Sequence, residues 1–204
     1  MSRITTVASA RKRKDDRDPY VCYSCHEPIA EGTAYAWTQP SRYSARINWH
    51  ATCPTPPGSM MEANEKRAAA MAAFENAYDS LDEIRSTDHG VDTNVDTTED
   101  DATVAEQVVE SIKSVLGQCA EEVREAAELW RESASNIEDG FGHPTSMSEE
   151  FEGYADEVEG IADEAEGIEP EEYDAEQYND LDEWVQATVD SVVDELGSIE
   201  GNLP

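Results

Sequence analysis

Three cysteines and one histidine near the N-terminus have the spacing of a metal site. They read Cys22-x2-Cys25, then 24 residues, then His50-x2-Cys53. Each tight pair lets both side chains reach one ion, and three cysteines with one histidine are a standard tetrahedral zinc set. Because four protein ligands leave no position for a substrate water, the pattern predicts a structural Zn²⁺ that organises a fold.

Two other interpretations of this cluster are a disulfide and chance clustering. Disulfide pairing would leave His50 without a role, and three clustered cysteines cannot all pair with one another. The fourth cysteine, Cys119, lies in the apolar stripe of a predicted helix. We therefore interpret Cys119 as a core thiol.

The 204-residue chain has a formal net charge of −33, and this charge is unevenly placed. Residues 1–58 contain eight Lys/Arg and five Asp/Glu, giving +3, so residues 59–204 carry −36. Such acidity is typical of disordered chains, of halophilic proteins adapted to molar salt, and of surfaces that bind a basic partner or imitate nucleic acid. Apolar periodicity in the acidic part argues against disorder, and the small share of lysine among the bases favours salt adaptation.

The sequence also restricts the compartment in which the protein works. No apolar run approaches the ~20 residues that a membrane-spanning helix needs, so no membrane partner is expected. The basic N-terminus lacks the apolar core of a secretory signal. The absence of these two signals, together with the metal-type cysteine spacing, predicts a reduced, cytoplasmic compartment. The cytoplasm could be one of high salt, and the protein could be encoded by a virus.

Alternating residues on both sides of a turn at 39–41 predict a β-hairpin within the metal-binding segment. The proline-rich residues 54–58 then form a stiff linker. The predicted fold is a small zinc finger with a β-hairpin, followed by an all-α antiparallel helical bundle. Its parts are a flexible basic arm (1–19), the zinc finger (20–55), a linker and first helix (56–85), an acidic linker (86–101) and the acidic antiparallel helical bundle (102–204).

Capping boxes predict helix starts at Ser59, Thr103 and Ser146, and Pro170 indicates the first turn of a last helix. The apolar stripe of the second helix repeats every eleven residues. That of the third helix is a heptad seam from Met147 to Ile168. Short turns between the last three helices favour the antiparallel bundle.

No catalytic set with usable spacing is found, which predicts a protein that is not an enzyme. The finger contains six of the 15 aromatic residues. These form the miniature core of a metal domain, or leave one or two rings exposed for stacking on bases. The basic arm either contacts phosphates or only keeps the chain soluble. The candidate nucleic-acid contacts are Arg11, Lys12, Arg13, Lys14, Arg42, Arg46 and Trp37.

The finger resembles the poly(ADP-ribose) polymerase (PARP)-type zinc finger. The resemblance rests on Cys22-x2-Cys25, Pro28-Ile29-x2-Gly32 and Trp49-His50-x2-Cys53, and it covers about residues 20–55. That family has the same ligand order, with an aromatic residue near the histidine, and commonly binds DNA ends and breaks. The resemblance implies zinc ligation by the four residues and DNA binding by the finger, with no single DNA-contacting residue carried over.

Two functions follow as hypotheses. In the first, a non-enzymatic zinc finger from a salt-adapted archaeon or its virus binds DNA, RNA or a protein, and the acidic bundle is a scaffold. In the second, the acidic bundle is the active part. It would then be a decoy or nucleic-acid mimic for a basic protein, or an assembly component that self-associates, and the zinc would be purely structural.

Overall fold

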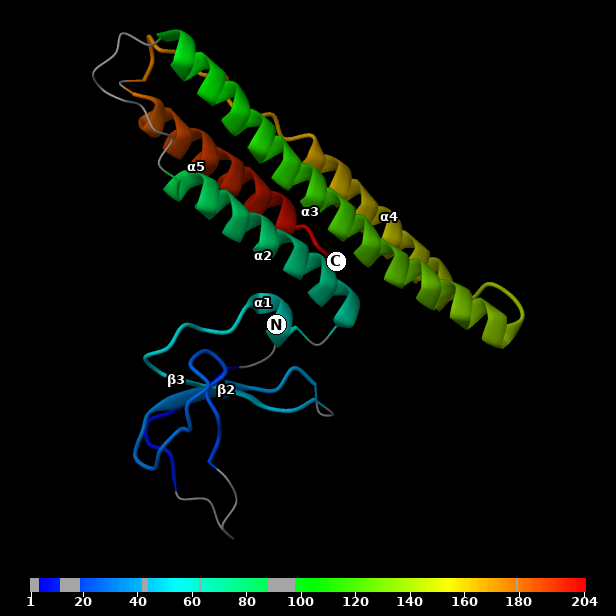
Figure 1. The fold of residues 1–204 in the computed structure, drawn as a ribbon. Coiled ribbons are helices and arrows are strands. Elements are labelled where there is room, and N and C mark those ends of the chain that lie inside the picture. Colours follow the sequence, from blue (N-terminus) through cyan, green and yellow to red (C-terminus); the bar gives the residue numbers. More distant parts are fainter. Residues whose placement is uncertain (1–3, 12–18, 42–43, 63, 88–97, 179) are drawn as a thin grey trace. The chain divides into compact units, whose positions relative to one another are not determined.

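The protein is described by a computed structural model that covers residues 4–11, 19–41, 44–62, 64–87, 98–178 and 180–204. The chain divides into two compact units, residues 1–68 and 69–204. The first contains a small sheet and the second contains long helices (Figure 1).

The sheet of the N-terminal unit has three antiparallel strands in the order β1-β2-β3. They are β1 (Thr5–Val7), β2 (Tyr35–Thr38) and β3 (Ile47–His50). Strands β2 and β3 pair from Tyr35 opposite His50 to Thr38 opposite Ile47. The hairpin predicted from the alternating residues is therefore confirmed.

Strand β1 corrects the prediction that residues 1–19 form a flexible arm. Thr5, Thr6 and Val7 are β-branched residues, which favour strands, and they pair with β2. Beyond the strand, Ala10 is buried and its N–H donates to the carbonyl of Thr33 at 2.8 Å. The described start of the chain is thus part of the folded unit.

The first predicted helix, from Ser59 to the end of the segment 56–85, is broken in two. A single turn, α1 (Gly58–Met61), precedes the long helix α2 (Glu65–Ser86). The side chain of Asn64 accepts a hydrogen bond from the Lys66 N–H at 3.1 Å and so caps the second piece. Ser59, the predicted cap, lies inside α1, whose N-cap position is Pro57.

The remaining long helices are α3 (Thr98–Phe141), α4 (Ser146–Glu166) and α5 (Leu181–Glu200). Helix α3 has 44 residues and is about 66 Å long at 1.5 Å per residue. It begins inside the predicted acidic linker 86–101, of which residues 88–97 lie outside the described part of the chain.

The helix caps explain two further differences from the predicted starts. Thr145 caps α4, one residue earlier than predicted, because its side chain and that of Ser148 each accept the other's backbone N–H. Asp180 caps α5 by accepting from the Glu183 N–H at 2.8 Å. The last helix therefore begins well after Pro170.

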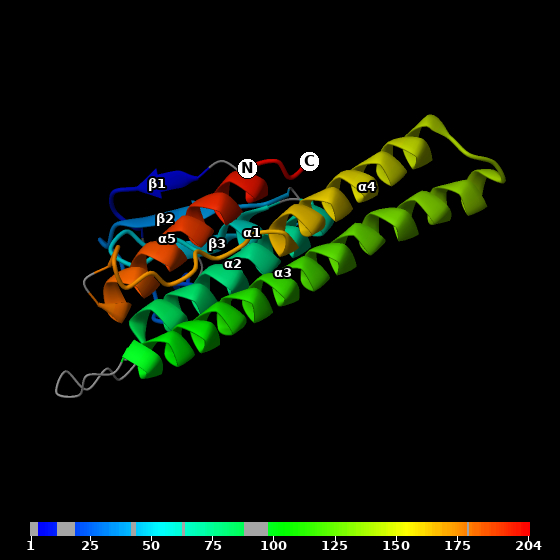
Figure 2. The same ribbon diagram turned by 90° about the horizontal axis from the view of Figure 1, so that it is seen from above.

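Helices α3 and α4 are antiparallel (Figures 1 and 2). Three ion pairs agree with this: as the basic residue moves toward the end of α3, its acidic partner moves toward the start of α4. The pairs are Lys113–Glu169, Arg124–Asp163 and Arg131–Asp156, with N···O distances of 2.7, 2.8 and 3.4 Å. Helices α2 and α5 are antiparallel in the same way, through Arg85–Asp190 and Tyr78–Glu200.

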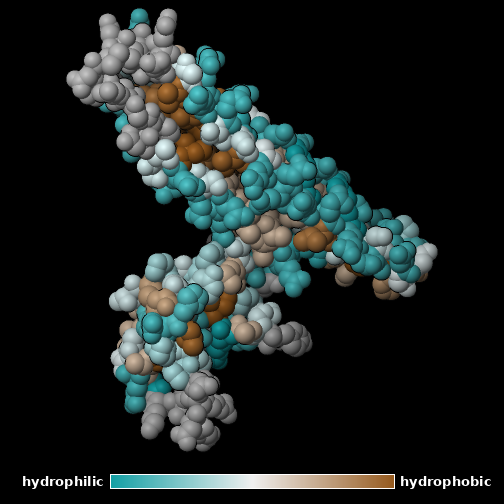
Figure 3. All heavy atoms as spheres, in the orientation of Figure 1, coloured by the Kyte–Doolittle hydropathy of each residue, from teal (hydrophilic) through white to brown (hydrophobic). Residues whose placement is uncertain are grey.

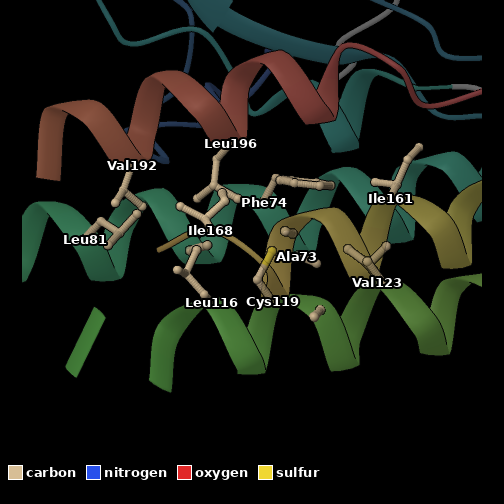
Figure 4. Packing of buried hydrophobic residues seen from close by; sticks show 14 of the residues in the cluster. Ala73, Phe74, Leu81, Leu116, Cys119, Val123, Ile161, Ile168, Val192 and Leu196 are labelled. Carbon is tan, nitrogen blue, oxygen red and sulfur yellow. The ribbon is translucent and has the colours of Figure 1, made fainter. Parts of the chain in front are cut away.

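One hydrophobic cluster joins all four long helices. Figure 4 shows Phe74 of α2, Leu116 of α3, Ile161 of α4 and Leu196 of α5 as members of it. Cys119 lies in the same cluster, and burial raises the pKa of its thiol to about 12. The interpretation of Cys119 as a core thiol is therefore confirmed.

Hydrophilic residues cover most of the helical unit on the face shown in Figure 3. In the described part of the chain, no helix combines the length and the apolar character that crossing a bilayer requires.

Two residues of the predicted heptad seam on α4 test the packing. Ile161 is 5% exposed, whereas Met147 is 57% exposed. Ile161→Ala is therefore expected to lower the free energy of unfolding by roughly 2–4 kcal/mol, because it leaves a cavity. Met147→Ala is expected to change it by less than about 0.5 kcal/mol. Urea unfolding followed by far-UV circular dichroism measures both, and equal losses would contradict this packing.

Candidate metal centre

The first ligand pair lies on a tight turn. Val21 and Pro28 form an isolated antiparallel bridge, and the Cys22 N–H donates to the Glu27 carbonyl at 2.9 Å. His26, with φ of 59°, adopts the left-handed conformation that reverses the chain. The turn thereby brings the side chains of Cys22 and Cys25 to one side.

The second ligand pair begins where β3 ends, at His50. The Cys53 N–H donates to the His50 carbonyl at 3.0 Å, so this pair also lies on a turn. Two hydrogen bonds connect the turns: Tyr23 N–H to the Asn48 carbonyl at 2.8 Å, and Ser24 Oγ to the Pro54 carbonyl at 2.8 Å.

The four ligand atoms of Cys22, Cys25, His50 and Cys53 all lie within 4.8 Å of one another. His50 Nδ1 is 3.3 Å from Cys25 Sγ and 3.8 Å from Cys53 Sγ. A tetrahedron with Zn–S of ~2.3 Å and Zn–N of ~2.1 Å has edges of roughly 3.6–3.8 Å. The cluster could therefore hold a metal ion, and its donor set is consistent with zinc.

Comparisons with known protein families, curated proteins and solved structures find no match to this chain. The metal centre is thus identified by its own residues. Within the described part of the chain, it is the only group of three or more His, Cys, Asp or Glu side chains that could hold an ion.

Two thiols of the cluster, those of Cys22 and Cys53, have shifted pKa values. Burial raises the pKa of Cys22, but hydrogen bonds from backbone N–H groups, including those of Cys25 and His50, outweigh it and bring the pKa to about 6. Burial, together with hydrogen bonds and charge from Cys22 and Cys25, raises the pKa of Cys53 to about 11. At neutral pH the site thus offers at least one thiolate, the form that binds a metal.

Cys22 connects the cluster to a small apolar core that includes Ile29, Ala36 and Trp49. Trp49, next to His50, is buried, and the rings of Tyr20 and Tyr35 lie 6.0 Å apart beside the core. These aromatic residues therefore have the structural role that the sequence allowed for them. Cys25 lies on the exposed side of the cluster.

Of the candidate nucleic-acid contacts, the structure brings two together. The guanidinium carbon of Arg46 lies 4.0 Å from the ring centroid of Trp37, which is cation–π geometry. Arg46 is exposed and Trp37 half-buried, and Arg11 is exposed just beyond Ala10. Lys12, Arg13, Lys14 and Arg42 lie outside the described residues.

Asn48 lies directly opposite Trp37 in the pairing register, on the same face of the sheet. It is 8% exposed, and its amide nitrogen donates to the Arg46 carbonyl at 3.3 Å. Trp37 and Trp49 consequently lie on opposite faces.

Thiol chemistry tests the metal centre. We expect one metal ion per chain, and its removal by a chelator should make three of the four thiols reactive toward a disulfide reagent. Cys119 should stay unreactive until the helices unfold, because it is buried and protonated. Metal analysis and timed thiol titration measure these outcomes.

Cys25→Ser should lose the metal, and Cys119→Ser is the matched control that should keep it. Unchanged metal content in the Cys25 variant, or loss of metal in the Cys119 variant, would contradict the site.

Proposed function

We propose that this chain is a non-enzymatic zinc-binding protein whose finger, residues 20–55, binds nucleic acid, with DNA as the main candidate. The observation that carries the proposal is the pairing of a Cys3His cluster with the Trp37–Arg46 stack on the same small unit. The zinc ion is structural, because four protein ligands complete its coordination. The PARP-type resemblance supports the same activity.

The stack supplies the contact chemistry. Aromatic rings receive bases of any sequence, and a stacked arginine can pair with a base face or with phosphate oxygens. Because Arg46 is exposed and Trp37 is half-buried beneath it, the guanidinium can move aside and admit a base. The basic cluster Arg11-Lys12-Arg13-Lys14 would add phosphate contacts.

The charge division supports finger-centred binding. Residues 1–58 carry +3, so this part of the chain can approach DNA, whereas residues 59–204 carry −36. In a high-salt cytoplasm, counterion release contributes little to affinity. Binding then depends on stacking and shape, and it should vary weakly with salt.

Trp37→Ala in the full chain is expected to weaken binding to single- or double-stranded DNA by about 1–3 kcal/mol, because one stacking surface is lost. Arg46→Ala should weaken it as well. Arg67→Ala is the matched control, since it removes one positive charge of the same unit, held by Glu62 at 2.9 Å. Fluorescence anisotropy at two KCl concentrations measures the affinities.

Metal content should be the same in these three variants. An equal loss in the Arg67 variant, or a steep loss of binding with added KCl, would contradict the proposal.

The alternative function places activity in the acidic helices, which we propose form an antiparallel bundle. The observation that favours it is that the basic side chains of residues 69–204 are paired with carboxylates. That unit contains four Lys/Arg, and all four are engaged by carboxylates: Arg85, Lys113, Arg124 and Arg131. The remaining acidic surface matches a basic protein, for which the chain would act as a decoy or mimic.

One variant separates the two functions. Cys25→Ser should abolish DNA binding if the finger is the active part. If the same variant still displaces DNA from a basic DNA-binding protein as well as the unaltered chain does, the helices are the active part and the finger-centred proposal is wrong.

Salt adaptation gives a further expectation. Repulsion among the excess carboxylates is screened over ~3 Å in 1 M salt, so the melting temperature of the full chain should rise between about 0.1 and 3 M KCl. Differential scanning calorimetry measures it, and a flat melting temperature over this range would contradict halophilic adaptation.

A further inference from the structure

One face of the finger's sheet carries a polar group that the proposed function has not yet used. In the pairing register, Trp37 of β2 has Asn48 of β3 on one side and Thr5 of β1 on the other. Side chains directly opposite each other point to the same face of a sheet, with Cβ atoms about 4.5–5.5 Å apart. The carboxamide of Asn48 therefore lies beside the indole of Trp37, and the opposite face, with Ala36 and Trp49, packs into the core.

The side-chain oxygen of Asn48 is a buried acceptor. The residue is 8% exposed, and in the described part of the chain no hydrogen bond reaches its Oδ1. The amide nitrogen donates one of its two N–H groups to the Arg46 carbonyl at 3.3 Å. The Arg46 guanidinium, 4.0 Å from the ring centroid of Trp37, does not donate to this oxygen. A buried acceptor of this kind costs free energy until a donor reaches it.

Such an acceptor selects one part of a DNA ligand. Along a DNA strand, the oxygens of phosphates and deoxyribose only accept hydrogen bonds, and the N–H donors belong to the bases. Because Asn48 Oδ1 is buried beside an aromatic ring, its donor has to come from a base that stacks on that ring. A base can enter in this way only where it is unpaired or extruded, because neighbouring bases cover both of its faces inside a duplex.

The carboxamide of Asn48 also favours one base. It holds an acceptor, Oδ1, next to the second N–H of Nδ2, so it can offer an acceptor and a donor side by side. Adenine presents the matching pair, the N6 amine and the N7 acceptor, and Asn pairs with adenine in this way. Stacking on Trp37 alone does not discriminate, since every base has a π face. Asn48 would therefore add selection to a ring that by itself accepts any base.

We propose that the finger binds an unpaired adenine, whose ring stacks on Trp37 in place of the Arg46 guanidinium and whose N6 amine donates to Asn48 Oδ1. This inference rests on the proposed function, because it names the base that the finger takes from DNA. Arg46 is exposed, so its side chain can leave the indole without disturbing the core.

Short single strands in which only the central nucleotide carries a base test this preference. The base is adenine in one strand and purine, which is adenine with hydrogen in place of the amine, in the other. Fluorescence anisotropy with the full, zinc-loaded chain should give an affinity at least about fivefold higher for the adenine strand. The two strands share their backbone and ring system, so the difference reports the amine.

Two variants connect the preference to Asn48. Asn48→Leu has nearly the same shape but lacks the carboxamide, so it should lower the affinity for the adenine strand to that for the purine strand. Thr5→Val is the matched control, because it removes a polar atom from the other side of Trp37 and should keep the preference. Zinc content and melting temperature show whether each variant is folded, and the comparison of the two strands on the unaltered chain needs no variant.

Equal binding of the adenine and purine strands by the unaltered chain would overturn the proposal. A preference that persists in the Asn48 variant, or that is lost in the Thr5 variant, would overturn it as well. The proposed function has its own readout, which is binding of mixed-sequence DNA that depends on Trp37. If that binding occurs while the two strands bind equally, the finger binds nucleic acid without selecting adenine. If no DNA binds, both proposals are wrong.

Discussion

The convergence of three thiols and one imidazole is the constraint on which the N-terminal unit depends. Its buried apolar core is small, consisting of Ala10, Cys22, Ile29, Ala36 and Trp49. A core of this size rarely offsets the loss of chain entropy, and domains of this kind usually need a metal or disulfides. The four ligands lie where the two ligand turns meet, and β3 leads directly into the second of these turns. Because Arg46 lies just before β3 and Trp37 lies on its partner strand β2, the position of the Trp37–Arg46 stack depends on the metal centre as well.

The helical unit is stabilised in a different way. Its four long helices share one extensive apolar cluster, which offsets the repulsion of an acidic surface. Three of its four bases reach carboxylates of a neighbouring helix: Arg85 contacts Asp190, Arg124 contacts Asp163 and Glu166, and Arg131 contacts Asp156 and Glu159. Exposed ion pairs contribute little energy individually. Their positions match the antiparallel direction of α3 and α4.

Residue spacing was enough to predict the four ligands, the hairpin and the buried position of Cys119. The ligands could be predicted because the short loop within each pair restricts which side chains can meet. Features that depend on tertiary pairing were not accessible. Strand β1 has only three residues, Thr5–Val7, and is stabilised by pairing with β2. The helix start at Glu65 depends on the cap that Asn64 provides. The position of Asn48 opposite Trp37 follows from the register with β2.

In the described part of the chain, the ion pairs between long helices connect α2 with α5 and α3 with α4. Arg85 and Tyr78 connect α2 to α5, and Arg124 and Arg131 connect α3 to α4. Between α2 and α3 lies a narrow gap of about 20 Å³, lined by small residues such as Ala73 and Ala77 and by Cys119. The Asn76 side-chain amide donates to Glu122 across this gap at 3.1 Å. Charge repulsion between α2 and α3 is therefore opposed by apolar packing and by this hydrogen bond. The thiol of Cys119 is thus a built-in probe of whether the two helix pairs separate before either pair unwinds.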